Sequence, residues 1–113
     1  MNPNDNRSIV VSALKHAAPY IRLFKGKVFV LKAGGEVFAD PATTKAMMEQ
    51  LGILHQVGIR MVLVHGGGPQ STLLAGALGV DTKFVDGRRV TDDQSLDVAT
   101  MVLNGQINTR ILA

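Results

Sequence analysis

The sequence has 113 residues and a mass of 12.1 kDa, which limits it to a single domain at most. Its hydrophobic content of 46% is enough for a folded core, whereas no apolar run approaches the roughly 20 residues that a membrane-spanning helix needs. Because the chain contains no cysteine, disulfides, thiolate metal sites and cysteine nucleophiles are excluded. The first residues are polar and lack the apolar stretch of a signal peptide, so we expect a cytoplasmic protein with no membrane partner.

The formal net charge of +3 raises the question of nucleic-acid binding, but the basic residues are scattered along the chain. Only two small pairs stand out, Lys25 with Lys27 and Arg88 with Arg89. One tyrosine and four phenylalanines offer no aromatic platform on which bases could stack. We therefore expect a basic pocket for a small anionic substrate, and no nucleic-acid partner.

The first part of the chain predicts a helix followed by a strand. Residues 1–7 are expected to be disordered, and apolar residues at helical spacing predict a helix over residues 8–24. Pro19 should kink this helix or restart it. The continuous apolar run 28–31 is typical of a strand that is buried on both faces, and a glycine turn at 32–35 ends it.

A second helix and a second strand follow. Asp40, with a proline after it, predicts the N-cap of a helix that Gly58 brings to an end. Residues 61–64 form a second apolar run of the buried-strand type. The sequence His-Gly-Gly-Gly-Pro at 65–69 then predicts a turn into another helix over residues 70–78.

The last part of the chain predicts a hairpin and a final helix. Residues 82–90, with an Asp-Gly pair at their centre, are typical of a β-hairpin. Thr91 and Gln94 predict a capping box at the start of the final helix. Two strands joined by a helix predict an α/β fold with a parallel sheet and a right-handed connection. The final helix reaches Ala113 without a stop signal, so we expect the domain to be truncated there.

Glycine-rich turns follow both predicted strands, at the edge where open α/β sheets bind ligands. The first turn contains Gly34 and Gly35, and the second contains residues 66–68. Without Cβ atoms, their N–H groups can approach an anion, and the helix after the second turn adds the positive end of its dipole. The ammonium group of Lys32 could stabilise a phosphoryl group transferred there. In the alternative interpretation, the glycines only make tight turns and Lys32 is a solvated strand end.

Neither a P-loop nor a dinucleotide fingerprint is present, so phosphate chemistry would need another architecture. Four stretches resemble the acetylglutamate kinase group of the amino-acid kinase family, namely residues 29–35, 62–70, 87–91 and 97–108. The resemblance covers residues 8–113. It implies an open αβα sandwich with a mainly parallel sheet, of which this chain would be the N-terminal, acetylglutamate-binding half.

The resemblance also implies an activity, in which the complete protein transfers a phosphoryl group from ATP to the side-chain carboxylate of N-acetyl-L-glutamate in arginine biosynthesis. Lys32 would then stabilise the transition state, and Gly34 and Gly35 would lie beside the phosphates of the nucleotide. The resemblance likewise implies Mg²⁺ together with ATP, and no metal ligand of the protein is identified. The chain alone is expected to be inactive, since the nucleotide-binding half of the family's domain has no counterpart in 113 residues.

The acceptor side of the implied site lies in the second turn and the hairpin. Gly67 and Gly68 would donate N–H groups to acetylglutamate, and Arg89 would hold its α-carboxylate through the bidentate guanidinium fork. In the alternative interpretation, Arg89 is a solvated hairpin arginine. His65 is expected to hold the loop by hydrogen bonding, because a carboxylate nucleophile is already ionised at neutral pH and needs no general base.

A second resemblance points to a different class of function. Residues 19–21, 34–36 and 54–60 resemble the kinase-like, arginine-binding domain of acetylglutamate synthases. A non-catalytic, arginine-sensing domain is therefore the alternative, although the intact Lys32 and the triple glycine favour a kinase. The N-terminal helix resembles the segment that links dimers into rings in arginine-inhibited kinases. We accordingly expect a homo-oligomer, with L-arginine as a candidate feedback inhibitor.

Overall fold

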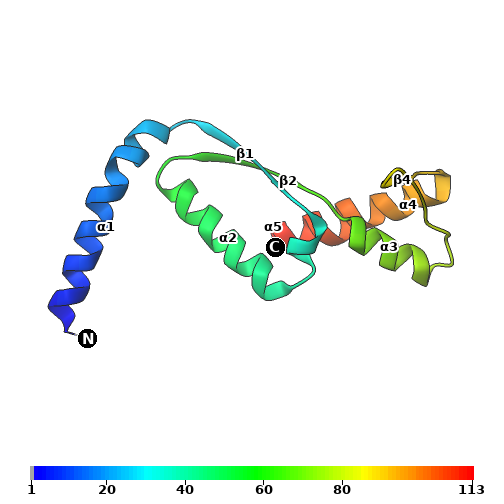
Figure 1. The fold of residues 1–113 in the computed structure, drawn as a ribbon, viewed down its shortest axis with the longest axis horizontal. Helices are drawn as coiled ribbons and strands as arrows, with labels where there is room; N and C mark the ends of the chain where they lie inside the picture. Colours follow the sequence, from blue (N-terminus) through cyan, green and yellow to red (C-terminus); the bar gives the residue numbers. More distant parts are fainter. Residues whose placement is uncertain (1) are drawn as a thin grey trace.

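The computed structural model describes residues 2–113, which fold into helices around a parallel pair of strands and a separate hairpin (Figure 1). The molecule is elongated, with extents of 60 × 32 × 27 Å, because the first helix projects away from the rest (Figure 1). No helix among residues 2–113 combines the length and the apolar character needed to cross a bilayer. The elements in chain order are α1 (Pro3–Phe24), β1 (Val28–Ala33), the 3₁₀ helix η1 (Gly35–Phe38), α2 (Pro41–Gln56), β2 (Arg60–His65), α3 (Gly68–Ala77), β3 (Lys83–Val85), β4 (Arg88–Val90), α4 (Asp93–Thr100), the π-helix η2 (Met101–Asn108) and α5 (Thr109–Leu112).

Helix α1 begins earlier than the sequence predicted. Asn2 caps it by accepting a hydrogen bond from the N–H of Asn4 at 3.2 Å, and Pro3 occupies the first helical position. The prediction of disorder over residues 1–7 was therefore wrong for residues 3–7, while Met1 lies outside the described residues. The helix also continues through Pro19 without restarting, and none of its residues is buried.

Strands β1 and β2 form the predicted parallel pair, with Val28 opposite Arg60 at one end and Ala33 opposite His65 at the other. Helix α2 joins the two strands. It begins where the carboxylate of Asp40 caps it, and it ends before Gly58, whose φ of +94° is readily adopted only by glycine. Because the pairing is in register and parallel, both strands end at the same edge of the sheet.

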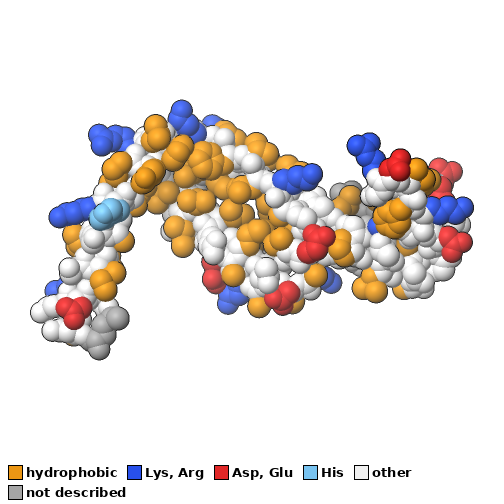
Figure 2. All heavy atoms as spheres, in the orientation of Figure 1, with side chains coloured by type: hydrophobic (Ala, Val, Ile, Leu, Met, Phe, Trp, Pro, Cys, Tyr) orange, Lys and Arg blue, Asp and Glu red, His pale blue; other side chains and the backbone are white. Residues whose placement is uncertain are grey.

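The sheet is covered on one face only. Along β1 and β2, partly or fully buried residues alternate with exposed ones, and Figure 1 shows α2 beneath the sheet. On the opposite face, Val30 is 69% exposed and Val62 is 47% exposed, and hydrophobic side chains gather over the two strands in Figure 2. The expectation that both strands are buried on both faces was wrong, because no helix among residues 2–113 covers this second face.

The hairpin forms as predicted, and the helix after it starts differently. Asp86 and Gly87 have positive φ angles of 50° and 74°, as a two-residue type I′ turn requires. The N-cap of α4 is Asp92, which accepts a hydrogen bond from the N–H of Ser95 at 2.8 Å. The predicted capping box of Thr91 and Gln94 was therefore wrong by one residue. Helical structure then continues through η2 into α5.

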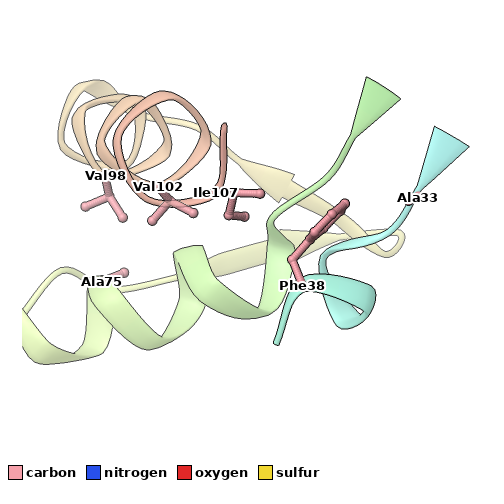
Figure 3. Packing of buried hydrophobic residues seen from close by; sticks show 6 residues of the cluster. All are labelled: Ala33, Phe38, Ala75, Val98, Val102 and Ile107. Atoms are coloured by element: carbon pink, nitrogen blue, oxygen red, sulfur yellow. The ribbon is translucent and has the colours of Figure 1, made fainter. Parts of the chain in front are cut away.

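The core lies directly beneath the C-terminal edge of the parallel strands. Figure 3 shows Val98, Val102 and Ile107 on one side of the final helical stretch, facing Ala75 of α3 and Phe38 of η1. Val102 is completely buried. The two turns that leave β1 and β2 therefore rest on the best-packed part of the chain.

The acidic N-caps provide a pH-dependent test of the fold. The Thr43 hydroxyl donates to Oδ2 of Asp40 at 2.7 Å, and the N–H groups of Thr43 and Ala42 donate to the same carboxylate. These hydrogen bonds, of which that from the Thr43 hydroxyl has the largest effect, hold the pKa of Asp40 below its usual value. Because the pKa of Asp40 is lower in the folded chain, its cap stabilises the fold above the unfolded-state pKa and is lost as the pH falls through the folded-state value.

We expect Asp40→Asn, which keeps an acceptor oxygen but does not titrate, to lose less thermal stability than the parent between about pH 5 and about pH 2. Circular dichroism melts at the two pH values measure this difference. Asp97→Asn, at an exposed position within α4, is the control and should follow the parent. Equal acid losses in Asp40→Asn and the parent would contradict a role for this cap in acid stability.

Candidate functional site

The two glycine turns touch each other at the end of the sheet. The N–H of Gly66 donates to the carbonyl of Ala33 at 2.9 Å, which joins the turns where the strands end. A Cβ on Gly35 would lie 2.9 Å from the Cα of Gly67, closer than real Cβ atoms approach. The first turn and the second turn therefore form one continuous surface, and the absence of a side chain at Gly35 is what permits the contact.

Lys32 lies on the uncovered face of the sheet, two residues before the first turn. Its side chain is exposed, and its partner in the parallel register is Val64. The alternation of β1 places it on the face opposite α2, at the same edge as the glycines. The structure thus brings the cation to the predicted edge, while its role there remains a prediction.

The first turn also carries a carboxylate that the sequence had not singled out. Oε2 of Glu36 occupies the space beside Gly34 where a Cβ would otherwise project. A carboxylate there would repel a bare polyphosphate, and it suits a hard cation, which prefers oxygen ligands. Among residues 2–113, no three or more His, Asp or Glu side chains are grouped so that they could hold a metal ion.

The second turn leads into α3, whose first N–H groups have no partner within the helix. Its first turn is closed by the N–H of Ser71, which donates to the carbonyl of Gly67 at 2.8 Å. Gly68 is exposed and has open space where a Cβ would be. Gly67 is buried, and a Cβ there would lie 2.7 Å from Cδ1 of Ile107. Packing therefore explains the glycine at 67 directly, whereas Gly68 faces free space.

Arg89 reaches from the hairpin to the second turn. Its Nη2 donates to the carbonyl of Gly68 at 3.0 Å and to Oγ1 of Thr72 at 2.7 Å. Its Nη1 donates to Oγ1 of Thr82 at 3.5 Å, and the guanidinium lies 5.1 Å from the ring centre of Phe84. Arg89 is therefore a half-buried cation that is hydrogen-bonded at the second turn, while its role in binding a substrate is a prediction.

Several of these partners were missed from the sequence. Thr72 could have been found, because it follows Gly68 by four residues and therefore lies on the same side of α3. Gln70 bridges the two turns, and nothing local in the sequence signals a contact with Gly35 across 35 residues. Gln70 also borders a cavity of about 590 Å³ behind the turns, which none of the six predicted site residues lines.

His65 has the loop-holding place that we expected. Its Nδ1 lies 3.3 Å from the carbonyl oxygen of Gly66, and its ring packs edge-to-face against Phe38 at 5.9 Å between centres. The imidazole thus links the end of β2 to the core.

Parallel strands ending in contacting glycine turns, with a cation at each turn, define an α/β domain suited to a small anionic ligand. The sequence profile of the amino acid kinase family matches residues 27–113, and the chain belongs to this family. The predicted α/β fold class and the predicted membership of the amino-acid kinase family are thereby confirmed.

The relatives in this family are long compared with the chain. It is 44% identical over 110 residues to an acetylglutamate kinase of Methanocorpusculum labreanum, covering 97% of the chain and 36% of that protein. It is 42% identical over 113 residues to an acetylglutamate kinase of Moorella thermoacetica, covering the whole chain and 37% of that protein. The chain therefore spans little more than a third of the length of the curated relatives it matches.

Among solved structures, the chain is similar to N-acetylglutamate synthase from Neisseria gonorrhoeae complexed with coenzyme A and N-acetyl-glutamate. The two superpose with a TM-score of 0.77 at 34% identity, over 90% of this chain and 24% of the synthase. A second structure of the same enzyme, with coenzyme A and L-arginine, gives a TM-score of 0.76.

The contact between the turns predicts how substitutions of glycine affect stability. Gly35→Ala should destabilise the complete protein by about 1–3 kcal/mol, because its Cβ would collide with backbone of the second turn. Gly52→Ala, inside α2 where a Cβ meets nothing within 4 Å, is the matched control and should stabilise by about 0.5–1 kcal/mol. Urea unfolding measures both, and an unchanged midpoint for Gly35→Ala would refute the close contact.

Proposed function

We propose that the chain is the acetylglutamate-binding part of an acetylglutamate kinase, whose complete form phosphorylates the side-chain carboxylate of N-acetyl-L-glutamate with ATP in arginine biosynthesis. The supporting observation is the contact between the two glycine turns, with Arg89 hydrogen-bonded to the second. The names of the relatives, which match nearly the whole chain, agree with this reaction.

The reaction suits an edge of this kind. A carboxylate oxygen of the acceptor attacks the γ-phosphorus of ATP, the bond to the β,γ-bridging oxygen breaks, and an acyl phosphate and ADP are formed. Because the acceptor is ionised at neutral pH, no proton has to be removed. Catalysis then consists of holding two anions in line and offsetting the charge on the transferring group.

On the donor side, Gly34 and Gly35 lie beside the nucleotide's phosphates and Lys32 stabilises charge in the transition state. Mg²⁺ bound with ATP would supply positive charge to the phosphates, and the carboxylate of Glu36 beside Gly34 would offer it a hard oxygen ligand. The carboxylate and the ammonium group together suit a metal-bound polyphosphate better than a bare one.

On the acceptor side, Arg89 holds the α-carboxylate while N–H groups of Gly67 and Gly68 face the rest of the substrate. The bonds of Arg89 to Gly68, Thr72 and Thr82 engage both N–H groups of Nη2 and one of Nη1, which leaves the Nε–H and one N–H of Nη1 free for the carboxylate. They also fix the guanidinium before the substrate arrives, which lowers the entropy lost on binding. The reaction is expected in the cytoplasm, catalysed by a homo-oligomer.

A second candidate function follows from the structural neighbours. N-acetylglutamate synthase from Neisseria gonorrhoeae has been solved with L-arginine, and its similarity to this chain supports an arginine-sensing domain as the alternative. Acetylglutamate-dependent ADP formation by the complete protein decides for the kinase, where L-arginine would act as a feedback inhibitor. Arginine binding without turnover decides for the sensor.

Lys32→Met tests the catalytic proposal. If Lys32 acts mainly on the transition state, kcat should fall ~10²- to 10³-fold while KM for acetylglutamate hardly changes. Lys32→Arg should restore little, because a planar guanidinium does not replace a compact ammonium group. Lys27→Met, the same change just before β1, is the control and should retain full turnover. A kcat within a few-fold of the parent for folded Lys32→Met would end the catalytic assignment.

Arg89 and its partner Thr72 predict a graded loss of substrate affinity. Arg89→Ala should weaken acetylglutamate binding ~10- to 150-fold, since a charged hydrogen-bonding group typically contributes about 1.5–3 kcal/mol. Thr72→Val, which only removes the oxygen that orients Arg89, should weaken it ~2- to 10-fold. Calorimetry with acetylglutamate and with ATP separates the two sides of the site, and ATP affinity should stay unchanged. Arg88→Ala, at the exposed neighbouring position of β4, is the control and should bind acetylglutamate like the parent. If Arg88→Ala and Arg89→Ala lose the same affinity for acetylglutamate, Arg89 is not part of the proposed site.

A further inference from the structure

One side chain crosses from the second turn to the first. Gln70 lies in the first turn of α3, and its Nε2 donates to the carbonyl of Gly35 at 2.6 Å. The two residues are 35 positions apart in the sequence, so this bond joins the turns through space. It is an addition to the bond between Gly66 and Ala33, which joins the turns closer to the strands.

The surroundings of the bridge are tight. A Cβ on Gly35 would lie 2.5 Å from Oε1 of Gln70 and 3.0 Å from Cδ of Pro69. The glycine at 35 and the amide at 70 therefore fit each other. A larger residue at 35 would push the amide away, and the bridge would be lost.

The hydrogen bond from Gln70 to Gly35 comes with a free-energy penalty, so it is a poor way to gain stability alone. Oε1 of Gln70 is buried and has no hydrogen-bond partner among the described residues. A buried amide oxygen without a partner is destabilising, whereas leucine would fill a similar volume without that penalty. The cost is explained if the position of the Gly35 carbonyl matters more than the stability of the contact.

We propose that Gln70 is a positioning residue that sets the separation of the two glycine turns. The inference rests on the proposed function, in which the turn at Gly35 holds the phosphates of ATP and the turn at Gly68 holds the acceptor. The separation of the turns then sets the distance between the γ-phosphorus and the attacking oxygen. Rate depends steeply on that distance, whereas the affinity of each substrate depends on its own turn.

Steady-state kinetics on the complete protein test this role through Gln70→Leu. We expect kcat to fall ~10- to 100-fold while KM for ATP and KM for acetylglutamate both stay within about threefold of the parent. Gln50→Leu, the same change at an exposed position of α2, should match the parent in all three constants. Unchanged kcat in folded Gln70→Leu overturns the inference, and so does a rise in one KM without a fall in kcat.

Gln70→Glu adds a pH readout that a packing role would not produce. The new carboxylate would face the Gly35 carbonyl without a proton to donate, so the bridge should be broken at neutral pH. Protonation restores a donor, and burial beside a carbonyl favours the protonated form. We expect kcat of Gln70→Glu relative to the parent to rise at least threefold as the pH falls from about 8 to about 5.5. A constant ratio across that range overturns the bridge.

Amide hydrogen exchange keeps this test separate from the test of the proposed function. In Gln70→Leu, exchange should accelerate at residues 34–38 as well as at residues 66–70, because both turns lose their partner. Acceleration confined to residues 66–70 overturns the inference, whether or not the parent uses acetylglutamate. If Gln70→Leu accelerates exchange in both turns while the parent forms no ADP with acetylglutamate, that pair of results supports the bridge and refutes the proposed function.

Discussion

The close contact between the turns at Gly35 and Gly67 is the constraint on which the site depends. Parallel pairing in register ends both strands at one edge, and the contact is possible because Gly35 carries no Cβ, whereas the missing Cβ of Gly67 makes room for the final helical stretch. Beneath the contact, Val102 and Ile107 support Gly67 from the final helical stretch. This stretch has π-helical geometry over Met101–Asn108, the segment that contains both residues. The packing of the core and the contact between the turns therefore meet at Gly67.

Arg89 extends this arrangement to the hairpin. β3 and β4 are short and mostly exposed, so a two-stranded hairpin of this size would be marginal by itself. The bonds from Arg89 to Gly68 and Thr72, together with its stacking on Phe84, attach the hairpin to the second turn. A single side chain thus orients the hairpin and brings a fixed positive charge to the glycines. The guanidinium is held by neutral oxygens alone, so its charge stays available to an anion.

Local patterns in the sequence were enough to predict most elements and the identity of the glycine turns. The Asp40 cap, the Gly58 stop and the Asp-Gly hairpin turn each depend on a few adjacent residues, and each was found. The features that were missed depend on distant partners. The bridge from Gln70 to Gly35 spans 35 residues, and the one-sided cover of the sheet depends on where helices pack rather than on how apolar the strands are. The site roles of the glycines and of Lys32 came from resemblance and chemistry, because no periodicity in a sequence encodes a ligand.

The two turns differ in their charged groups, so the two ends of the sheet edge suit different anions. The first turn combines the Lys32 cation with the Glu36 carboxylate, which suits a polyphosphate that brings its own divalent metal. The second turn combines the N-terminus of α3 with Arg89 and no carboxylate contact, which suits a ligand that arrives as a bare anion. Under the proposed function, the first turn would bind one anion as a metal complex, and the fixed donors of the second turn would bind the other anion directly. Because the turns are in contact, the proposed function would place the two ligands next to each other, each with its own counter-charge.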